Sequence, residues 1–433
     1  MTRHPTPTIV PAGTPGGDGP PDDRTAGRAR AIVAALAVSQ TVGYGALYYS
    51  FAVLLTPLAR DLDTSTTTIT GAFTAATLAG ALAAVPVGRW LDRHGGRALM
   101  TTGSLAGTLL LAAMSQVDTV PQLYAVWIGI GLACAMSLYE AAFAVIVTWH
   151  QTAARRANAL LAVTVVAGFA SSIFLPLTGA LVQEYGWRTA VAILAAVHGL
   201  LTVPLHAGAV RRPPRPLTPR ADAGRTAARR RAVRAAVRDR YFWLLTVAFV
   251  AHAGALSALT VHLIAYLMDL GHPAVFAATV AGLLGVLSVT GRVAVTGLQR
   301  RVRTTTVVAA AFAVQAIAAA ALPLTGHTTI GAIVGVTGFG LGFGVATIAR
   351  PAVLAARYGT TGYATIAGLL TVPMTIAKAG APLAAAALHT ATRTYTPVLV
   401  ATAIGCLIAA VGLAAIPAPQ RAPQSTAPPR EKS

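Results

Sequence analysis

The chain has 433 residues, of which 55% are hydrophobic and only 11% charged, and its mean hydropathy is +0.65. A soluble domain of this length needs far more charge to stay in solution, so this composition predicts an integral membrane protein. The net charge of +20 does not indicate nucleic-acid binding, because the arginines cluster between apolar runs rather than on one face of a soluble fold.

Residues 1–27 are rich in Pro, Gly and Thr and are expected to form a disordered cytoplasmic tail. They do not resemble a signal peptide, because no apolar core precedes a cleavage site. Charge-poor runs of about 20 residues, enough to cross a bilayer, then recur up to Ile416. The predicted spans are 31–58, 70–91, 98–117, 122–149, 158–182, 188–210, 241–268, 274–298, 304–324, 330–354, 364–388 and 397–416. A second disordered cytoplasmic tail is expected at 417–433.

The predicted fold is therefore all-α, with twelve transmembrane helices in two six-helix bundles, 28–210 and 241–416, joined by a basic cytoplasmic linker at 211–240. Arginines concentrate in that linker and in alternate loops, which by the positive-inside rule places both termini in the cytoplasm of a multi-pass cell-membrane protein. The linker can also contact anionic membrane lipid, as a minor addition to its topological role.

Short matches at a nearly constant offset indicate that the two sets of six spans arose by duplication. Gly-Ile-Gly-Leu at 129–132 resembles Gly-Phe-Gly-Leu at 338–341, and Leu-Pro-Leu at 175–177 resembles Ala-Pro-Leu at 381–383. Such internal repeats are common in secondary transporters, whose halves are related by a pseudo-two-fold axis.

A specific short motif lies between the second and third spans, where residues 88–97 read Gly-Arg-Trp-Leu-Asp-Arg-His-Gly-Gly-Arg. Gly88 allows close helix contact, Asp92 can pair with arginines or cap a neighbouring helix, and Gly95 with Gly96 makes a tight turn. The expected latch residues between two halves are Gly88, Asp92, Arg93, Gly95 and Arg97. The second copy expected near Gly297 lacks the acid.

The 88–97 motif resembles the cytoplasmic loop signature of the major facilitator superfamily, and the resemblance covers roughly residues 31–416. Within it, Tyr-Gly-Ala-Leu-Tyr at 44–48, Gly291-Arg292 and Lys378 are similar to the monocarboxylate porters and oxalate–formate antiporters. That likeness implies that the cations of spans 8 and 11 hold an anionic substrate. The Gly-Pro ending of span 5 that is usual in drug–proton antiporters is absent around Pro176.

Ionisable residues inside spans are costly and usually have a partner or a task. Lys378, near the middle of span 11, is the only lysine outside the C-terminal tail. It is a counter-ion for an anionic substrate, a residue that loses its proton during the transport cycle, or one partner of a fixed ion pair with a buried acid. Glu140 in span 4 is either a proton carrier or, since the repeat sets it beside the mate of Arg350 in span 10, one half of an ion pair that closes the cytoplasmic mouth.

Five more residues are candidate substrate contacts. Arg292 can bind a carboxylate or simply snorkel to the interface. Gln40, Tyr44 and Tyr48 share one face of span 1, and a polar–aromatic stripe of this kind should face a cavity. His252 is central in span 7, where a hydrogen-bonded packing role is the alternative to a ligand contact.

These features predict a secondary transporter of a small organic anion, working by proton symport or by exchange with a counter-substrate. The runner-up is proton-coupled efflux of a drug-like or secondary metabolite, and a membrane sensor is a distant third. The chain has no phosphate-binding Gly-x-x-x-x-Gly-Lys loop, no metal-ligand cluster and no nucleophile constellation, so we expect no cofactor and no enzyme activity. Cys134 and Cys406 lie in apolar stretches and suggest neither a disulfide nor a zinc site.

Overall fold

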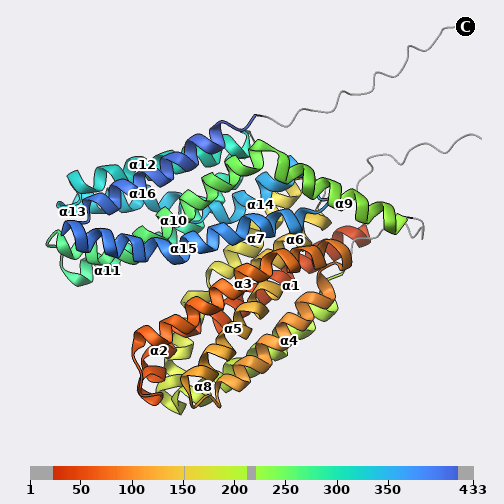
Figure 1. The fold of residues 1–433 in the computed structure, drawn as a ribbon, viewed down its shortest axis with the longest axis horizontal. Coiled ribbons are helices and arrows are strands. Elements are labelled where there is room, and N and C mark those ends of the chain that lie inside the picture. Colours follow the sequence, from red (N-terminus) through yellow and green to blue (C-terminus); the bar gives the residue numbers. More distant parts are fainter. Residues whose placement is uncertain (1–22, 151, 212–220, 300, 418–433) are drawn as a thin grey trace, which may run out of the picture.

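The computed structural model describes residues 23–150, 152–211, 221–299 and 301–417, and the regular structure in these ranges is helical (Figure 1). Within these described ranges, eleven helical segments are long and apolar enough to cross a membrane. One of them, Ala153–Ala209, has 57 residues, or about 85 Å at 1.5 Å per residue, whereas a hydrocarbon core is about 30 Å thick. It turns back at Gly186 (φ 77°, ψ 162°), so it crosses twice and the predicted all-α membrane fold of twelve spans is confirmed.

The first bundle contains spans 1 to 6. Its elements are α1 (Asp23–Tyr44), η1 (Gly45–Tyr49), α2 (Ser50–Asp61), α3 (Thr66–His94), α4 (Gly96–Met114), α5 (Val120–Ser137), α6 (Tyr139–Trp149), α7 (Ala153–Gly168) and α8 (Ala170–Ala209). The tail predicted at 1–27 overlaps this bundle, because α1 already begins at Asp23. Residues 1–22 and 418–433 of the two predicted tails lie outside the described residues.

The second bundle contains spans 7 to 12 and follows a helix in the basic linker. Its elements are α10 (Arg240–Asp269), α11 (Ala274–Leu298), α12 (Thr304–Thr325), α13 (Thr329–Leu341), α14 (Val345–Tyr358), α15 (Tyr363–Thr392) and α16 (Thr396–Ala414). The linker helix is α9 (Ala221–Arg238), and residues 212–220 before it lie outside the described part of the chain.

Spans 1, 4 and 10 are interrupted near their middles, which apolar length alone does not predict. Span 1 widens into the π-turn η1, span 4 breaks at the extended residue Leu138, and span 10 breaks at Gly342–Gly344. A break leaves the last carbonyls of the first half-helix without helical donors. Side-chain amides supply donors instead: Gln40 Nε2 lies 2.8 Å from Ser137 O, and Gln315 Nε2 lies 2.8 Å from Phe339 O.

The two bundles meet along α3 and α15 and diverge away from the end that carries α9 (Figure 1). Glycine permits the contact, because a Cβ placed on Gly88 would overlap the backbone of Ala364 and one on Gly368 would overlap the backbone of Ala84. Backbone thus packs directly on backbone at this seam.

Hydrogen bonds to Asp239 stabilise the α9 end of the second bundle. Its carboxylate accepts hydrogen bonds from the backbone N–H of Tyr241 (3.1 Å), the Tyr358 hydroxyl (3.0 Å) and Arg357 Nη2 (3.2 Å). Burial by itself raises the pKa of this carboxyl, but these hydrogen bonds and the Arg357 charge outweigh it and lower the pKa. The ionised Asp239 therefore caps α10 and ties it to the end of α14.

Candidate functional site

A cavity of about 200 Å³ lies between the bundles, in the middle of the molecule. Most of its wall comes from the first bundle, and Thr371 and Thr375 of α15 contribute from the second. Five aromatic side chains line it: Tyr44, Tyr48, Phe73, Trp127 and Tyr139. Their rings are in contact, with centroids 5.1 Å apart for Tyr48–Phe73 and 4.5 Å apart for Tyr44–Tyr139. The cavity therefore has one continuous aromatic wall.

An ion pair between the two bundles borders this cavity. Glu140, which lines the cavity in the first turn of α6, accepts a hydrogen bond from Arg350 of α14. The break at Leu138 creates that helix N-terminus, whose dipole stabilises a carboxylate. Arg350 is only 11% exposed and also donates to Thr371 Oγ1 (3.2 Å). The structure thus contains the contact that the internal repeat predicts, while its role as a gate or proton site stays a prediction.

Lys378 is positioned midway along α15. Thr371, Thr375 and Lys378 are spaced four and three residues apart, so Lys378 shares the helix face of the two cavity-lining threonines. Its side chain is exposed, and its charge is near enough to those of Glu140 and Arg350 to interact with them. Within the described part of the chain, the Lys378 ammonium group forms no ion pair or hydrogen bond.

Local sequence explains how the backbone at Lys378 is held. In a helix the carbonyl of residue 378 would accept from the N–H of residue 382, but Pro382 has none. Ser257 Oγ of α10 donates to the Lys378 carbonyl instead, at 2.8 Å, and His262 Nε2 lies 3.0 Å from the carbonyl of Pro382. The proline four residues after the lysine was the available signal for these contacts, although the sequence does not identify Ser257.

Arg292 of α11 connects three parts of the molecule. Its Nη1 donates to the carbonyl of Thr164 in α7 (2.8 Å), and its Nε donates to the carbonyl of Gly344 at the break of span 10 (3.2 Å). The guanidinium is thus occupied by backbone carbonyls of both bundles. In this conformation Arg292 bridges the bundles, and the carboxylate contact expected for it stays a prediction.

The remaining predicted substrate contacts divide into two groups. Tyr44 and Tyr48 line the cavity. Gln40 is fully buried against Ser137, and His252 is 1% exposed, sharing a hydrogen bond of 2.8 Å with Gln315 Oε1. The structure therefore favours packing and helix support for Gln40 and His252. Phe73, Trp127 and Tyr139 are cavity residues that the sequence did not single out, because their helix rotation is set by tertiary packing.

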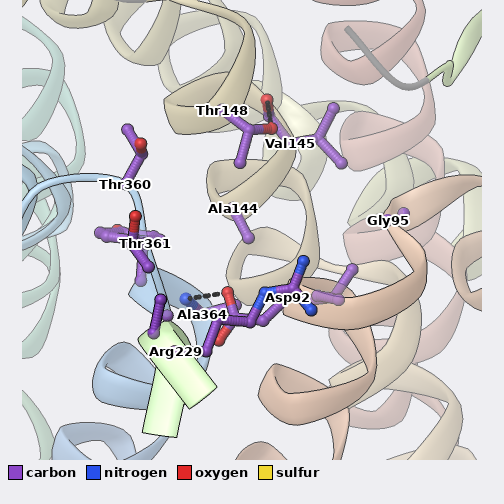
Figure 2. A pocket seen from close by; sticks show the side chains of 14 residues that line it. Asp92, Gly95, Ala144, Val145, Thr148, Arg229, Thr360, Thr361 and Ala364 are labelled. Atoms are coloured by element: carbon purple, nitrogen blue, oxygen red, sulfur yellow. Dashed lines mark hydrogen bonds between the residues drawn. The ribbon is translucent and has the colours of Figure 1, made fainter. Parts of the chain in front are cut away.

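At the α9 end, Asp92 joins the two bundles as the cap of a neighbouring helix (Figure 2). Its carboxylate accepts from the backbone N–H groups of Ala364 (3.1 Å) and Thr365 (2.9 Å) and from Thr365 Oγ1 (2.6 Å), in the first turn of α15. Asp92 thus caps the N-terminus of α15, one of the two partners expected for it, and the positive charge of Arg229 in α9 also acts on it.

The other latch residues shape the first bundle around Asp92. Gly95, with φ 77°, ends α3 and permits the turn into α4, whereas Arg93 lies in the last turn of α3. Arg97 Nε donates to the carbonyl of Ala207 (2.6 Å), a contact inside the first bundle. Asp92, Gly95 and Arg229 of α9 all line a second pocket, of about 260 Å³ (Figure 2).

The profile of the Major Facilitator Superfamily matches residues 36–379. A search of curated protein sequences finds no match. Among solved structures, the chain is similar to the fucose:proton symporter FucP of E. coli, with 16% identity over 88% of this chain and 97% of that one and a TM-score of 0.69.

Two further structures resemble the chain. The proton:xylose symporter XylE is 12% identical over 89% of this chain and 95% of that one, with a TM-score of 0.68. The human organic anion transporter MFSD10 is 15% identical over 91% of this chain and 100% of that one, with a TM-score of 0.66. At these identities the likeness is one of fold.

Proposed function

The chain belongs to the major facilitator superfamily, and from this premise we propose that it moves a small organic anion across the cell membrane by alternating access. Family membership makes it a multi-pass membrane transporter of small molecules rather than an enzyme. We also propose that transport is coupled to protons or to a counter-substrate, and that the chain is of the type of the monocarboxylate porters and oxalate–formate antiporters.

One observation carries the proposal: Lys378 presents an unpaired cation beside the central cavity. Of the three nearby cations, Arg350 is paired with Glu140 and Arg292 is held by carbonyls, whereas Lys378 has no partner among the described residues. An unpaired charge at mid-membrane is costly. An anionic substrate that enters the cavity would neutralise it, which supplies binding energy where the solute must be recognised.

Glu140 provides a route to proton coupling. The same Arg350 that pairs with Glu140 lies near Lys378, so protonation of Glu140 would leave Arg350 free to attract an anion. FucP and XylE are named as proton symporters and MFSD10 as an organic anion transporter, and both properties are compatible with this proposal. We infer a cytoplasmic position for α9 and both termini from the arginine distribution.

The second candidate is proton-coupled efflux of a drug-like or secondary metabolite. It is favoured by the aromatic wall of the cavity, which suits an apolar compound without a charge. In that case transport would depend on Glu140 and tolerate loss of Lys378.

The test is uptake of labelled carboxylates into proteoliposomes, with and without a pH gradient. We expect Lys378→Ala to lower uptake at least tenfold and Lys378→Arg to restore little, because a guanidinium differs in shape and hydration from an ammonium group. Lys432→Ala, which removes the only other lysine, is the matched control and should transport normally. Anion uptake that persists in Lys378→Ala would refute the proposal.

A further inference from the structure

We propose that Arg292 is a second latch between the two bundles, which holds the seam between α7 and α11 closed where the repeated loop motif has lost its acid. The latch acts on the movement of the bundles. It rests on the alternating access of the proposed function and is independent of the class of substrate.

The internal repeat relates two seams between the bundles. It matches span 2 with span 8 and span 5 with span 11, so the seam of α3 with α15 corresponds to the seam of α11 with α7. In the two copies of the loop motif, Gly88 corresponds to Gly297. Arg301 occupies the position of Asp92. The carboxylate that caps α15 across the first seam is therefore replaced by an arginine in the second copy.

The matched glycines show that the two seams are packed differently. A Cβ on Gly88 would overlap the backbone of Ala364, whereas a Cβ on Gly297 would meet nothing within 4 Å among the described residues. Contact with α7 is instead made by side chains of α11, because a Cβ on Gly168 would lie 3.5 Å from Arg292 Nη1 and 3.7 Å from Val289 Cγ2. The second seam thus relies on side chains where the first has backbone on backbone.

Arg292 is anchored in its own bundle and reaches across this seam. It lies six residues before the end of α11 at Leu298, or about 9 Å along the helix. Its Nε donates to the carbonyl of Gly344 in the second bundle, and a Cβ on Gly344 would lie 2.5 Å from that Nε, so glycine is needed for this approach. Its Nη1 donates to the carbonyl of Thr164 in the first bundle. Separation of α7 from α11 would therefore break the Thr164 contact and leave the Gly344 contact in place.

The partner of Arg292 suits a contact that opens and closes. A hydrogen bond from a charged donor is stronger than one between neutral groups, so it favours the closed seam. The Thr164 carbonyl is neutral, and opening leaves no unpaired counter-charge behind. Breaking the Glu140–Arg350 pair, in contrast, separates two charges. The two contacts therefore close the same conformation by different means.

The experiment measures distances between spin labels across this seam by double electron–electron resonance, in the full-length protein without substrate. Labels on Ala154→Cys in α7 and Leu298→Cys in α11 are exposed at the α9 end, and the native cysteines are replaced by alanine. We expect Arg292→Gln to raise the ratio of long to short distances by about fivefold or more. Arg292→Lys should give an intermediate ratio, because an ammonium group lacks the planar fork that serves two carbonyls.

Two control variants separate the latch from a general effect of losing an arginine or a glycine. Arg303→Gln removes an arginine that also donates to a carbonyl, that of Ile416, but inside the second bundle, so the distances should not change. Gly168→Val keeps the charge and crowds Arg292 Nη1, so it should open the seam. Gly179→Val is its control, since a Cβ there meets nothing within 4 Å among the described residues.

The outcomes distinguish this latch from the proposed transport. An unchanged distance distribution in folded Arg292→Gln would refute the latch, and Gly168→Val decides in the same way if Arg292→Gln does not fold. A shift in Arg292→Gln, together with no uptake of any labelled carboxylate by the unmodified protein, would support the latch and refute anion transport.

Discussion

At the residue scale, the Glu140–Arg350 pair joins two charges that neither bundle can easily keep alone. Removing one partner of a buried ion pair typically costs about 3–5 kcal/mol, because the other charge is left unpaired. Replacing both charges costs much less. The contact between α6 and α14 therefore depends strongly on the presence of both residues. This dependence suits an ion pair that forms in one conformation of the transporter and breaks in another.

We predict that Glu140→Gln and Arg350→Gln each destabilise the protein by about 1–3 kcal/mol, less than a fully buried pair because Glu140 remains 29% exposed. The double variant should recover at least half of the combined loss. Thermal unfolding in detergent measures this coupling. The swapped variant, Glu140→Arg with Arg350→Glu, is the companion test for transport, and strictly additive losses would show that the two residues act independently.

The carbonyl of Lys378 allows a test by compensation. Ser257→Ala removes its donor and should cost about 1 kcal/mol, with a measurable loss of anion uptake, because the backbone beside the lysine is released. Pro382→Ala restores an N–H at the helical position, so the same serine substitution should have less than half its effect in that background. Equal effects in both backgrounds would mean that Ser257 does not act through this carbonyl.

At the element scale, the bilayer explains how much of the fold could be predicted. Hydrocarbon thickness sets the length of each span, so apolar runs locate the helices, and the rise per residue locates Lys378 near the middle of its span. The break at Leu138 has no such signal, because it is supported by the hydrogen bond from Gln40 to Ser137, two residues that are 97 positions apart. The carbonyl partners of Arg292 and the burial of His252 depend on helix rotation in the same way, so the residues of the site were easier to predict than their contacts.

The close contact between α3 and α15 predicts how a larger residue at this contact shifts the equilibrium between conformations. A Cβ at Gly88 would overlap the Ala364 carbonyl, so Gly88→Ala should disfavour the arrangement in which the α9 ends of the bundles touch. Distances between spin labels on the α9 ends of the two bundles should lengthen in the variant. Gly297→Ala is the matched control, since a Cβ there meets nothing within 4 Å. An unchanged distance distribution in Gly88→Ala would show that this seam does not set the balance.

At the scale of the whole molecule, the contacts between bundles are concentrated at one end. Asp92 with α15 and Arg292 with Thr164 both join the bundles, and the ion pair borders the cavity between them. The ribbons diverge away from α9 (Figure 1). With α9 in the cytoplasm, as the arginine distribution predicts, the described conformation is closed to the cytoplasm, and its cavity is the one that an external solute would enter.

The two native cysteines can report this state. Cys134 lines the cavity, whereas Cys406 is fully buried in α16. A membrane-impermeant methanethiosulfonate reagent should therefore modify Cys134 in right-side-out vesicles several times faster than in inside-out vesicles, and Cys134→Ser should abolish the labelling. Gly88→Ala should reverse this preference, because it opens the α9 end. Labelling that is equally fast from both sides in the unmodified protein would contradict a cavity closed at the α9 end.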